Sequence, residues 1–216
     1  MLRVDLLGQD APRKLVMHNV SRNSSYTARD LDVLRRLVVF SRVNGDKYSW
    51  IRLVDIQSMS PSLDGDIELF IEWTQSYHYY EGDLIVISKP MLPFLIAHRA
   101  CGCRTMAHGQ EILQIADQFI FGDEISAGWV ALRDVVGRVV RIRYGQKMRI
   151  ATLESALIRR VASWAAKSSL RKLSHMEQHS NQLVVKFSVV QHRFSCYLFR
   201  IVSYVTAYFA SKKLSN

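Results

Sequence analysis

Four residues that are able to bind a metal ion lie close together in the sequence: His98, Cys101, Cys103 and His108. Zinc is held in proteins by four nitrogen or sulfur ligands in a tetrahedral array, which this set could supply. However, Cys-x-Cys is a tighter pair than the common Cys-x2-Cys, and the neighbouring arginines would repel a cation. We therefore expect a loop with reduced thiols and no bound metal, with zinc binding open as the alternative.

The sequence contains no recognised catalytic pattern. His175 and His179 are four residues apart, but Glu177 follows the first histidine by two positions, which is not the spacing of a zinc protease. No glycine-rich phosphate loop and no Gly-x-Ser-x-Gly motif occurs. We therefore expect a protein that is not an enzyme and holds no cofactor. Three cysteines favour a reducing compartment, and the start of the chain lacks the pattern of a secretion signal.

The charged residues are distributed unevenly along the chain. The 29 Lys and Arg and 19 Asp and Glu give a formal net charge of +10. Residues 133–216 carry +13 of this, whereas residues 1–132 carry −3. A block of one sign repels itself unless a polyanion offsets it, and both nucleic acid and anionic lipid could do so. A basic surface that is merely solvated is the alternative interpretation.

The basic block is predicted to contain a strand followed by a helix. Residues 138–144 alternate, which is typical of a half-buried strand, and this places Arg141 and Arg143 together on the exposed face. Thr152 is a plausible N-cap for a helix that reaches about Leu173. The candidate phosphate contacts, for nucleic acid or lipid, are Arg138, Arg141, Arg143, Lys147, Arg149, Arg160, Lys167, Arg171 and Lys172.

The C-terminal segment 194–210 has a single charge, Arg200. Its apolar residues recur with a period of about 3.6, which predicts an amphipathic helix. They are Phe194, Tyr197, Leu198, Ile201, Val205, Tyr208 and Phe209. This helix is expected to pack in the core or to lie on anionic lipid; it is short for a membrane span.

The remaining pattern predicts an α+β fold with an antiparallel sheet and a few packed helices. We expect an acidic, β-rich half over residues 1–132 and a basic half with amphipathic helices over 133–216, or else a single domain over 1–216. Predicted strands cover residues 15–20, 48–56, 66–73 and 182–190, a helix covers 27–42, and residues 77–87 form a hairpin.

The acidic residues of the first half are also clustered. They are Asp64, Asp66, Glu68, Glu72, Glu81 and Asp83. We expect this acidic face to meet the basic face of a neighbouring copy, which predicts a homo-oligomer that dissociates at high salt.

Three segments of residues 15–90 carry a resemblance to a known family: LVMHNVSRNSSYTARDLDVLRRLV, GDKYSWIRLVDI and YHYYEGDLIVISKP. Taken in order, they resemble the matrix proteins of rhabdoviruses. The resemblance implies a non-enzymatic α+β protein that self-associates, coats the inner face of a membrane and condenses a ribonucleoprotein. It also implies a location in the host cytoplasm, at the membrane periphery and in the virion. A viral RNA-binding accessory protein, such as a movement protein or a silencing suppressor, is the alternative.

Overall fold

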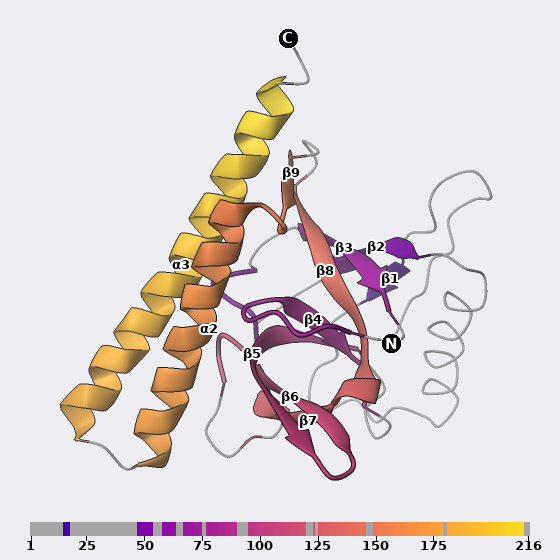
Figure 1. Cartoon of the computed structure of the whole chain (residues 1–216). Helices are drawn as coiled ribbons and strands as arrows, with labels where there is room; N and C mark the ends of the chain where they lie inside the picture. The colour runs from indigo at the N-terminus through magenta and orange to yellow at the C-terminus, as the bar shows by residue number, and fades with distance from the viewer. Residues whose placement is uncertain are drawn as a thin grey trace.

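Figure 1 shows the chain as a computed structural model, in which two long helices pack beside a twisted sheet. The structure describes residues 15–17, 47–53, 58–63, 67–74, 77–89, 95–119, 123, 125–145, 149–178 and 181–213. Within these ranges nine strands and two α-helices form an α+β fold, which confirms the predicted class.

The sheet is antiparallel except at one edge, where β1 runs parallel to β2. Its strands are β1 (Leu15–Met17), β2 (Tyr48–Leu53), β3 (Ile67–Trp73), β4 (Leu84–Ile87), β5 (Ile96–Met106), β6 (Gly109–Ile115), β7 (Ala127–Ala131), β8 (Val135–Tyr144) and β9 (Arg149–Thr152). The order is β1-β2-β3-β8-β4-β5-β6-β7, with β9 paired to β8. A short 3-10 turn, η1 (Leu132–Asp134), joins β7 to β8.

β8 lies between β3 and β4, so the sheet continues across the charge boundary at residue 132. The close approach of β3 depends on Gly137, where an added Cβ would lie 2.8 Å from Ile71 Cγ2 and 2.9 Å from the Glu72 carbonyl oxygen. Any larger residue would push the strands apart. The basic strand is therefore built into the centre of the acidic half.

The helices α2 (Ala156–Glu177) and α3 (Gln182–Lys213) form an antiparallel pair. α2 packs on β5, and α3 continues past it to β9 (Figure 1). The face that α3 buries is unusual because most of its residues are small or polar. It comprises Ser188, His192, Ser195, Cys196, Phe199, Ser203 and Ala207.

Several predicted elements are corrected by the structure. The predicted strand 182–190 is wrong, because these residues form the first turns of α3. Valine lowers helix propensity only slightly, and no glycine or proline after Gly145 interrupts the helix. Packing of α3 on α2 outweighs the local preference of the valines for a strand. Thr152 is not the N-cap of α2; it pairs with Arg141 in the sheet, and Ser155 takes the N-cap position.

The predicted hairpin over 77–87 is also wrong, because residues 77–80 form no strand and β4 pairs with β5 and β8 instead. The predicted loop at His98–His108 is mostly strand β5. The predicted strands at 48–56 and 66–73 are confirmed as β2 and β3 within the described residues. The predicted helix 27–42 lies outside the described residues.

Candidate functional site

Two of the predicted phosphate contacts on β8 are neutralised by carboxylates of β3. Arg138 Nε lies 2.7 Å from Glu72 Oε2, and Arg143 Nη1 lies 2.6 Å from Glu68 Oε2. Both pairs follow from the register, which places Glu72 opposite Arg138 and Glu68 opposite Arg143. Burial alone would raise the pKa of Glu72, but hydrogen bonds from Arg138 and Lys47 outweigh it and lower the pKa.

These pairs correct two predictions. Arg143 is not presented to solvent together with Arg141; its guanidinium lies between Glu68 and the Trp50 ring, 3.9 Å from the ring centroid. The acidic face is not free to meet a neighbouring copy at Glu68 and Glu72, because both carboxylates have partners in their own chain. Asp64 and Asp66, predicted as part of that face, lie outside the described residues.

Two further predicted contacts do not form an open basic surface. Arg149 donates a hydrogen bond to the Tyr204 hydroxyl, and its guanidinium lies 4.9 Å from the Tyr208 ring centroid. Lys172 is buried, with Nζ 3.9 Å from the Phe119 ring centroid, and burial lowers its pKa. Its prediction as a surface contact is therefore wrong. Lys147 lies outside the described residues.

The remaining predicted cations are exposed. Arg141, Arg160 and Arg171 have no carboxylate partner within 4 Å in the part of the chain that the structure describes, and Lys167 Nζ lies 3.6 Å from Glu81 Oε2. Arg160, Lys167 and Arg171 follow at steps of seven and four, so they share one face of α2. We call them the α2 cation row.

The outer face of α3 carries large apolar side chains. They are Leu183, Phe187, Val190, Phe194, Tyr197, Ile201, Tyr204, Val205 and Phe209, with exposed fractions from 41% to 72%. We call this set the α3 stripe; at 100° per residue it lies opposite the buried serines. Large apolar residues thus face outward where a monomeric soluble helix would bury them.

The stripe includes five of the seven C-terminal residues that the sequence predicted as membrane or packing contacts. Leu198 and Tyr208 are half-buried, and Leu198 packs on the core. The part from Leu183 to Val190 was missed because these residues were predicted to form a strand. Their spacing of four and three residues is the signal that would have joined them to the rest.

Basic side chains border the stripe on both sides. Lys186 and Arg193, seven residues apart and exposed, follow one edge of it. Trp164 of α2 meets Phe194 edge to face with ring centroids 5.8 Å apart, so α2 and its cation row adjoin the other edge. α3 contains no acidic residue, and α2 contains only Glu177 at its end. The result is an apolar strip between two rows of cations.

Neither described helix combines the length and hydropathy that crossing a membrane requires.

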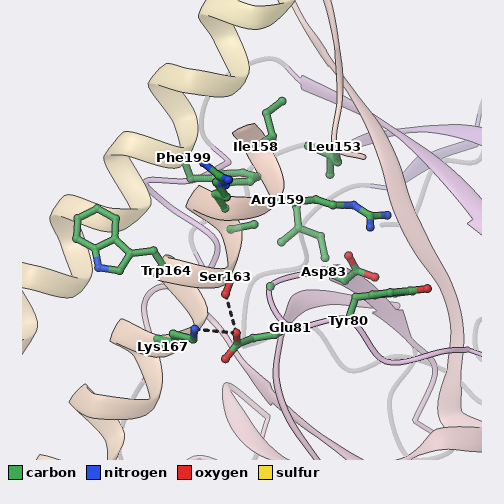
Figure 2. Close-up of a pocket in the computed structure, with 14 residues that line it drawn as sticks. Tyr80, Glu81, Asp83, Leu153, Ile158, Arg159, Ser163, Trp164, Lys167 and Phe199 are labelled. Atoms are coloured by element: carbon green, nitrogen blue, oxygen red, sulfur yellow. Dashed lines mark hydrogen bonds and ion pairs between the residues drawn. The ribbon is translucent and has the colours of Figure 1, made fainter. Parts of the chain in front are cut away.

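A cleft of about 500 Å³ opens between α2 and the turn that precedes β4 (Figure 2). Buried apolar side chains, including Ile158 and Phe199, form its floor. Its polar lining comes from Tyr80, Glu81, Asp83, Arg159, Arg160, Ser163 and Lys167. Arg159 was not among the predicted contacts.

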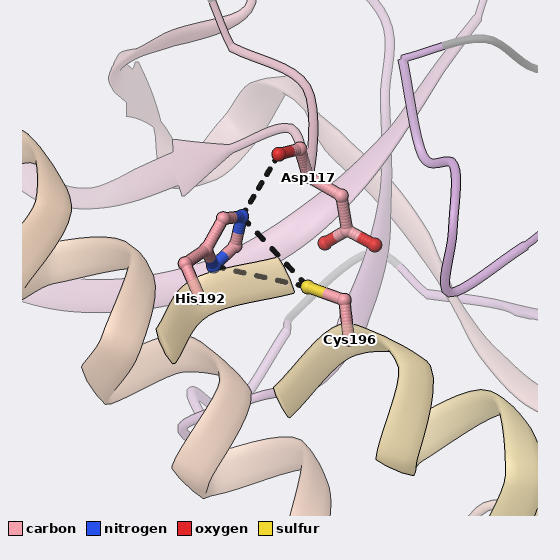
Figure 3. A group of neighbouring side chains, drawn as sticks. All are labelled: Asp117, His192 and Cys196. Atoms are coloured by element: carbon pink, nitrogen blue, oxygen red, sulfur yellow. Dashed lines mark hydrogen bonds between the residues drawn. The ribbon is translucent and has the colours of Figure 1, made fainter. Parts of the chain in front are cut away.

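A second group of reactive side chains lies in the interior, where Asp117, His192 and Cys196 place possible ligand atoms within 4.8 Å of one another (Figure 3). His192 Nε2 lies 2.8 Å from the Asp117 carbonyl oxygen, and Cys196 Sγ is 3.8 Å from both ring nitrogens. Arg99, fully buried, places Nε 3.6 Å from Asp117 Oδ1 and already supplies a positive charge there. Burial raises the pKa of the Cys196 thiol, which keeps it protonated. This group is therefore better suited to fixing α3 to the sheet than to metal binding or catalysis.

The four residues first considered as metal ligands do not converge. His98 and Cys101 are buried, whereas Cys103 and His108 are exposed. The His98 ring bonds the Gln114 amide, and His108 Nε2 lies 3.0 Å from Glu111 Oε1. The two histidines therefore bond different residues and are not arranged to share one metal ion.

The resemblance to rhabdovirus matrix proteins stays a prediction, because comparisons with known proteins neither support nor oppose it. The chain matches no family model, and no curated protein and no solved structure is significantly similar to it.

Proposed function

We propose that this protein is a non-enzymatic assembly protein that binds anionic membrane surfaces through the outer face of α2 and α3. The observation that carries the proposal is the α3 stripe between two rows of cations. An amphipathic helix with apolar and aromatic residues on one face and basic residues beside it lies in the interface of a bilayer. Each cation near an anionic surface contributes about 1 kcal/mol, and each well-buried large apolar side chain about 1.5–3 kcal/mol.

A membrane suits this surface better than a second copy of the chain. If two copies paired through the stripe, Lys186, Arg193 and the α2 cation row of one copy would approach the same cations of the other copy. The only acidic residue of the two helices, Glu177, lies at the end of α2 and does not separate these cations. On a bilayer the same long side chains can extend to lipid phosphates while their stems cover the apolar strip. Tyr197 and Tyr204 also suit the boundary between hydrocarbon and water.

The proposed role is matrix-like, in line with the resemblance of residues 15–90. In such a role the protein would also contact ribonucleoprotein and further copies of itself, in the host cytoplasm, at the membrane periphery and in the virion. RNA binding alone is the second candidate, since exposed cations such as Arg160 and Arg171 could bind RNA phosphates. It ranks second because phosphate contacts leave the α3 stripe without a partner.

Co-flotation with liposomes tests the proposal. The protein should float with vesicles that contain phosphatidylserine and remain behind with neutral phosphatidylcholine vesicles. A parallel RNA-binding series across salt concentrations separates the second candidate, because RNA cannot float a protein. RNA binding with a steep salt slope and no flotation would replace the membrane proposal by the RNA-binding one.

A further inference from the structure

The cleft in Figure 2 has a rigid rim, which is formed by the turn at Gly82. Gly82 adopts φ +92°, and an added Cβ would lie 2.5 Å from the Ala162 carbonyl carbon, so the turn rests directly on the α2 backbone. Its amide donates to the Ala100 carbonyl oxygen at 2.8 Å, and its carbonyl accepts from Arg99 Nη1 at 3.2 Å. The cleft is therefore formed before any ligand arrives, which lowers the ordering cost of binding.

Both cations and carboxylates line the cleft. At one end, Glu81 Oε2 accepts a hydrogen bond from Ser163 Oγ at 2.6 Å and lies 3.6 Å from Lys167 Nζ. At the other end, Asp83 accepts a hydrogen bond from the buried Tyr77 hydroxyl at 3.1 Å. Each of these carboxylates has further acceptor capacity, because an ionised carboxylate can accept about four hydrogen bonds.

Two arginines of this lining have no carboxylate oxygen within 4 Å among the described residues. Arg159 lies over the exposed ring of Tyr80, 5.2 Å from its centroid, and Arg160 is exposed beside it. Arginine binds phosphate oxygens with two parallel hydrogen bonds. Unpaired guanidinium groups beside carboxylates would suit a ligand that is anionic at one point and rich in hydroxyl groups elsewhere.

We propose that the cleft binds a phosphorylated polyol, and that its source is the headgroup of a membrane lipid. Arg159 and Arg160 bind the phosphate, Glu81 and Asp83 accept hydrogen bonds from ring hydroxyls, and the Tyr80 ring packs against the C–H face of the polyol. Arg160 and Trp164 belong both to the cleft and to the outer face of the helices, so the cleft opens beside the α3 stripe. The inference thus rests on the proposed function and adds headgroup selectivity to it.

The mixed lining disfavours the other common anionic ligands. A bare phosphate would leave Glu81 and Asp83 close to its charge without hydroxyl donors between them. Phosphatidylserine brings a carboxylate of its own and no ring hydroxyls, so it cannot use the two acidic acceptors in the same way. A polyol phosphate offers phosphate oxygens that accept hydrogen bonds from the arginines and hydroxyl groups that donate to the carboxylates of Glu81 and Asp83.

Vesicle binding at matched surface charge tests the inference. We expect binding to vesicles with phosphatidylinositol 4,5-bisphosphate to be at least ten times tighter than binding to phosphatidylserine vesicles of equal total charge. Soluble inositol 1,4,5-trisphosphate should compete for the cleft, and inorganic phosphate should not. Competition by inorganic phosphate at the same concentration would overturn the polyol assignment. If calorimetry showed that the soluble trisphosphate binds, but the protein bound the two kinds of vesicle equally, a lipid headgroup would be ruled out as the source of the ligand.

Two variants on the same helix provide the matched comparison. Arg159→Gln should remove the preference for the bisphosphate lipid and leave phosphatidylserine binding unchanged, because its side chain lies in the cleft. Arg171→Gln, outside the cleft, should weaken binding to both vesicles equally. If Arg159→Gln and Arg171→Gln changed the preference for the bisphosphate lipid equally, the inference would be overturned. Binding to phosphatidylserine without headgroup preference contradicts this inference alone, whereas no binding to any anionic vesicle contradicts the proposed function.

Discussion

Arg143 of β8 and Glu68 of β3 form an ion pair 75 positions apart in the sequence, with Nη1 2.6 Å from Oε2. The side chains are 20% and 10% exposed, so water screens the pair only in part. The same guanidinium lies over Trp50 of β2, and the contact therefore joins three strands. Charges of opposite sign from the two halves of the chain are thus paired across the sheet.

Replacing Glu68 by Gln should lower the free energy of unfolding by about 2 kcal/mol, because it leaves a half-buried guanidinium without its anion. For a chain of this size, that corresponds to about 4–8 °C in the midpoint of thermal unfolding. Arg141→Gln is the matched control: Arg141 is on the same strand but exposed, and its loss should change the midpoint by less than about 2 °C. Equal shifts would show that the ion pair contributes nothing.

Arg171 and Lys172 are neighbours on α2, but Arg171 is exposed and Lys172 is buried. Lys172→Ala should lower the free energy of unfolding by about 1–3 kcal/mol, because the buried stem and the contact with Phe119 are lost. It should leave vesicle binding unchanged. Arg171→Ala should instead weaken binding to phosphatidylserine vesicles without changing stability. Urea unfolding and co-flotation of both variants check the pair, and weaker vesicle binding by folded Lys172→Ala would contradict this assignment.

The α3 stripe is tested by introducing charge at its centre. Ile201→Asp should reduce phosphatidylserine vesicle binding at least tenfold, because it removes apolar insertion and adds a repelled anion. Ile125→Asp is the control, since Ile125 is 44% exposed but lies in the turn before β7 and is not part of the α3 stripe. Both variants should keep the circular dichroism spectrum of the native protein. A similar loss of binding in both would show that only net charge matters.

The sequence predicted what depends on local periodicity. β2, β3, the basic strand β8 and most of α2 follow from alternation or from i+3 and i+4 spacing. The same rule failed for residues 182–190, where β-branched residues favour a strand locally and packing of Ser188 and His192 on the rest of the chain favours the helix.

The candidate site could be predicted only in part, because exposure is set by long-range contacts. Charge counting could not reveal that Glu68 and Glu72 lie opposite Arg143 and Arg138, since register between distant strands is not a local property. Nor could it separate exposed Arg171 from buried Lys172. The periodic pattern of apolar residues in the C-terminal segment was visible in the sequence. That these residues face outward is shown only by the structure, in which α3 buries serines instead of leucines.

Thiol reactivity should distinguish the three cysteines. Burial raises the pKa of Cys101 to about 12 and also raises that of Cys196, so both stay protonated and shielded near neutral pH. Cys103 is exposed on β5. A maleimide or disulfide reagent at pH 8 should therefore modify one thiol rapidly in the native protein and three in denaturant. Cys103→Ser should abolish the rapid phase; rapid modification of two native thiols would contradict the buried positions.

Acid should destabilise the fold through His98. Burial lowers the pKa of His98 to about 4, despite the opposing hydrogen bond with Gln114, whereas an unfolded histidine titrates near 6.5. Between these values the unfolded chain binds the extra proton, so stability falls as pH drops, by up to about 1.4 kcal/mol per pH unit from this group. Burial also lowers the pKa of His192, which adds a loss in the same direction.

Urea unfolding between pH 4 and pH 8 measures this dependence. His98→Gln cannot be protonated, so it should lose less stability than the native protein between pH 6.5 and pH 4. At pH 7 it should be less stable than the native protein, because a buried ring has been replaced. His78→Gln is the matched control, because it removes an exposed histidine. If His98→Gln and the native protein show the same slope, the acid sensitivity arises from carboxylate pairs such as Glu72–Arg138 instead, and Glu72→Gln should then flatten it.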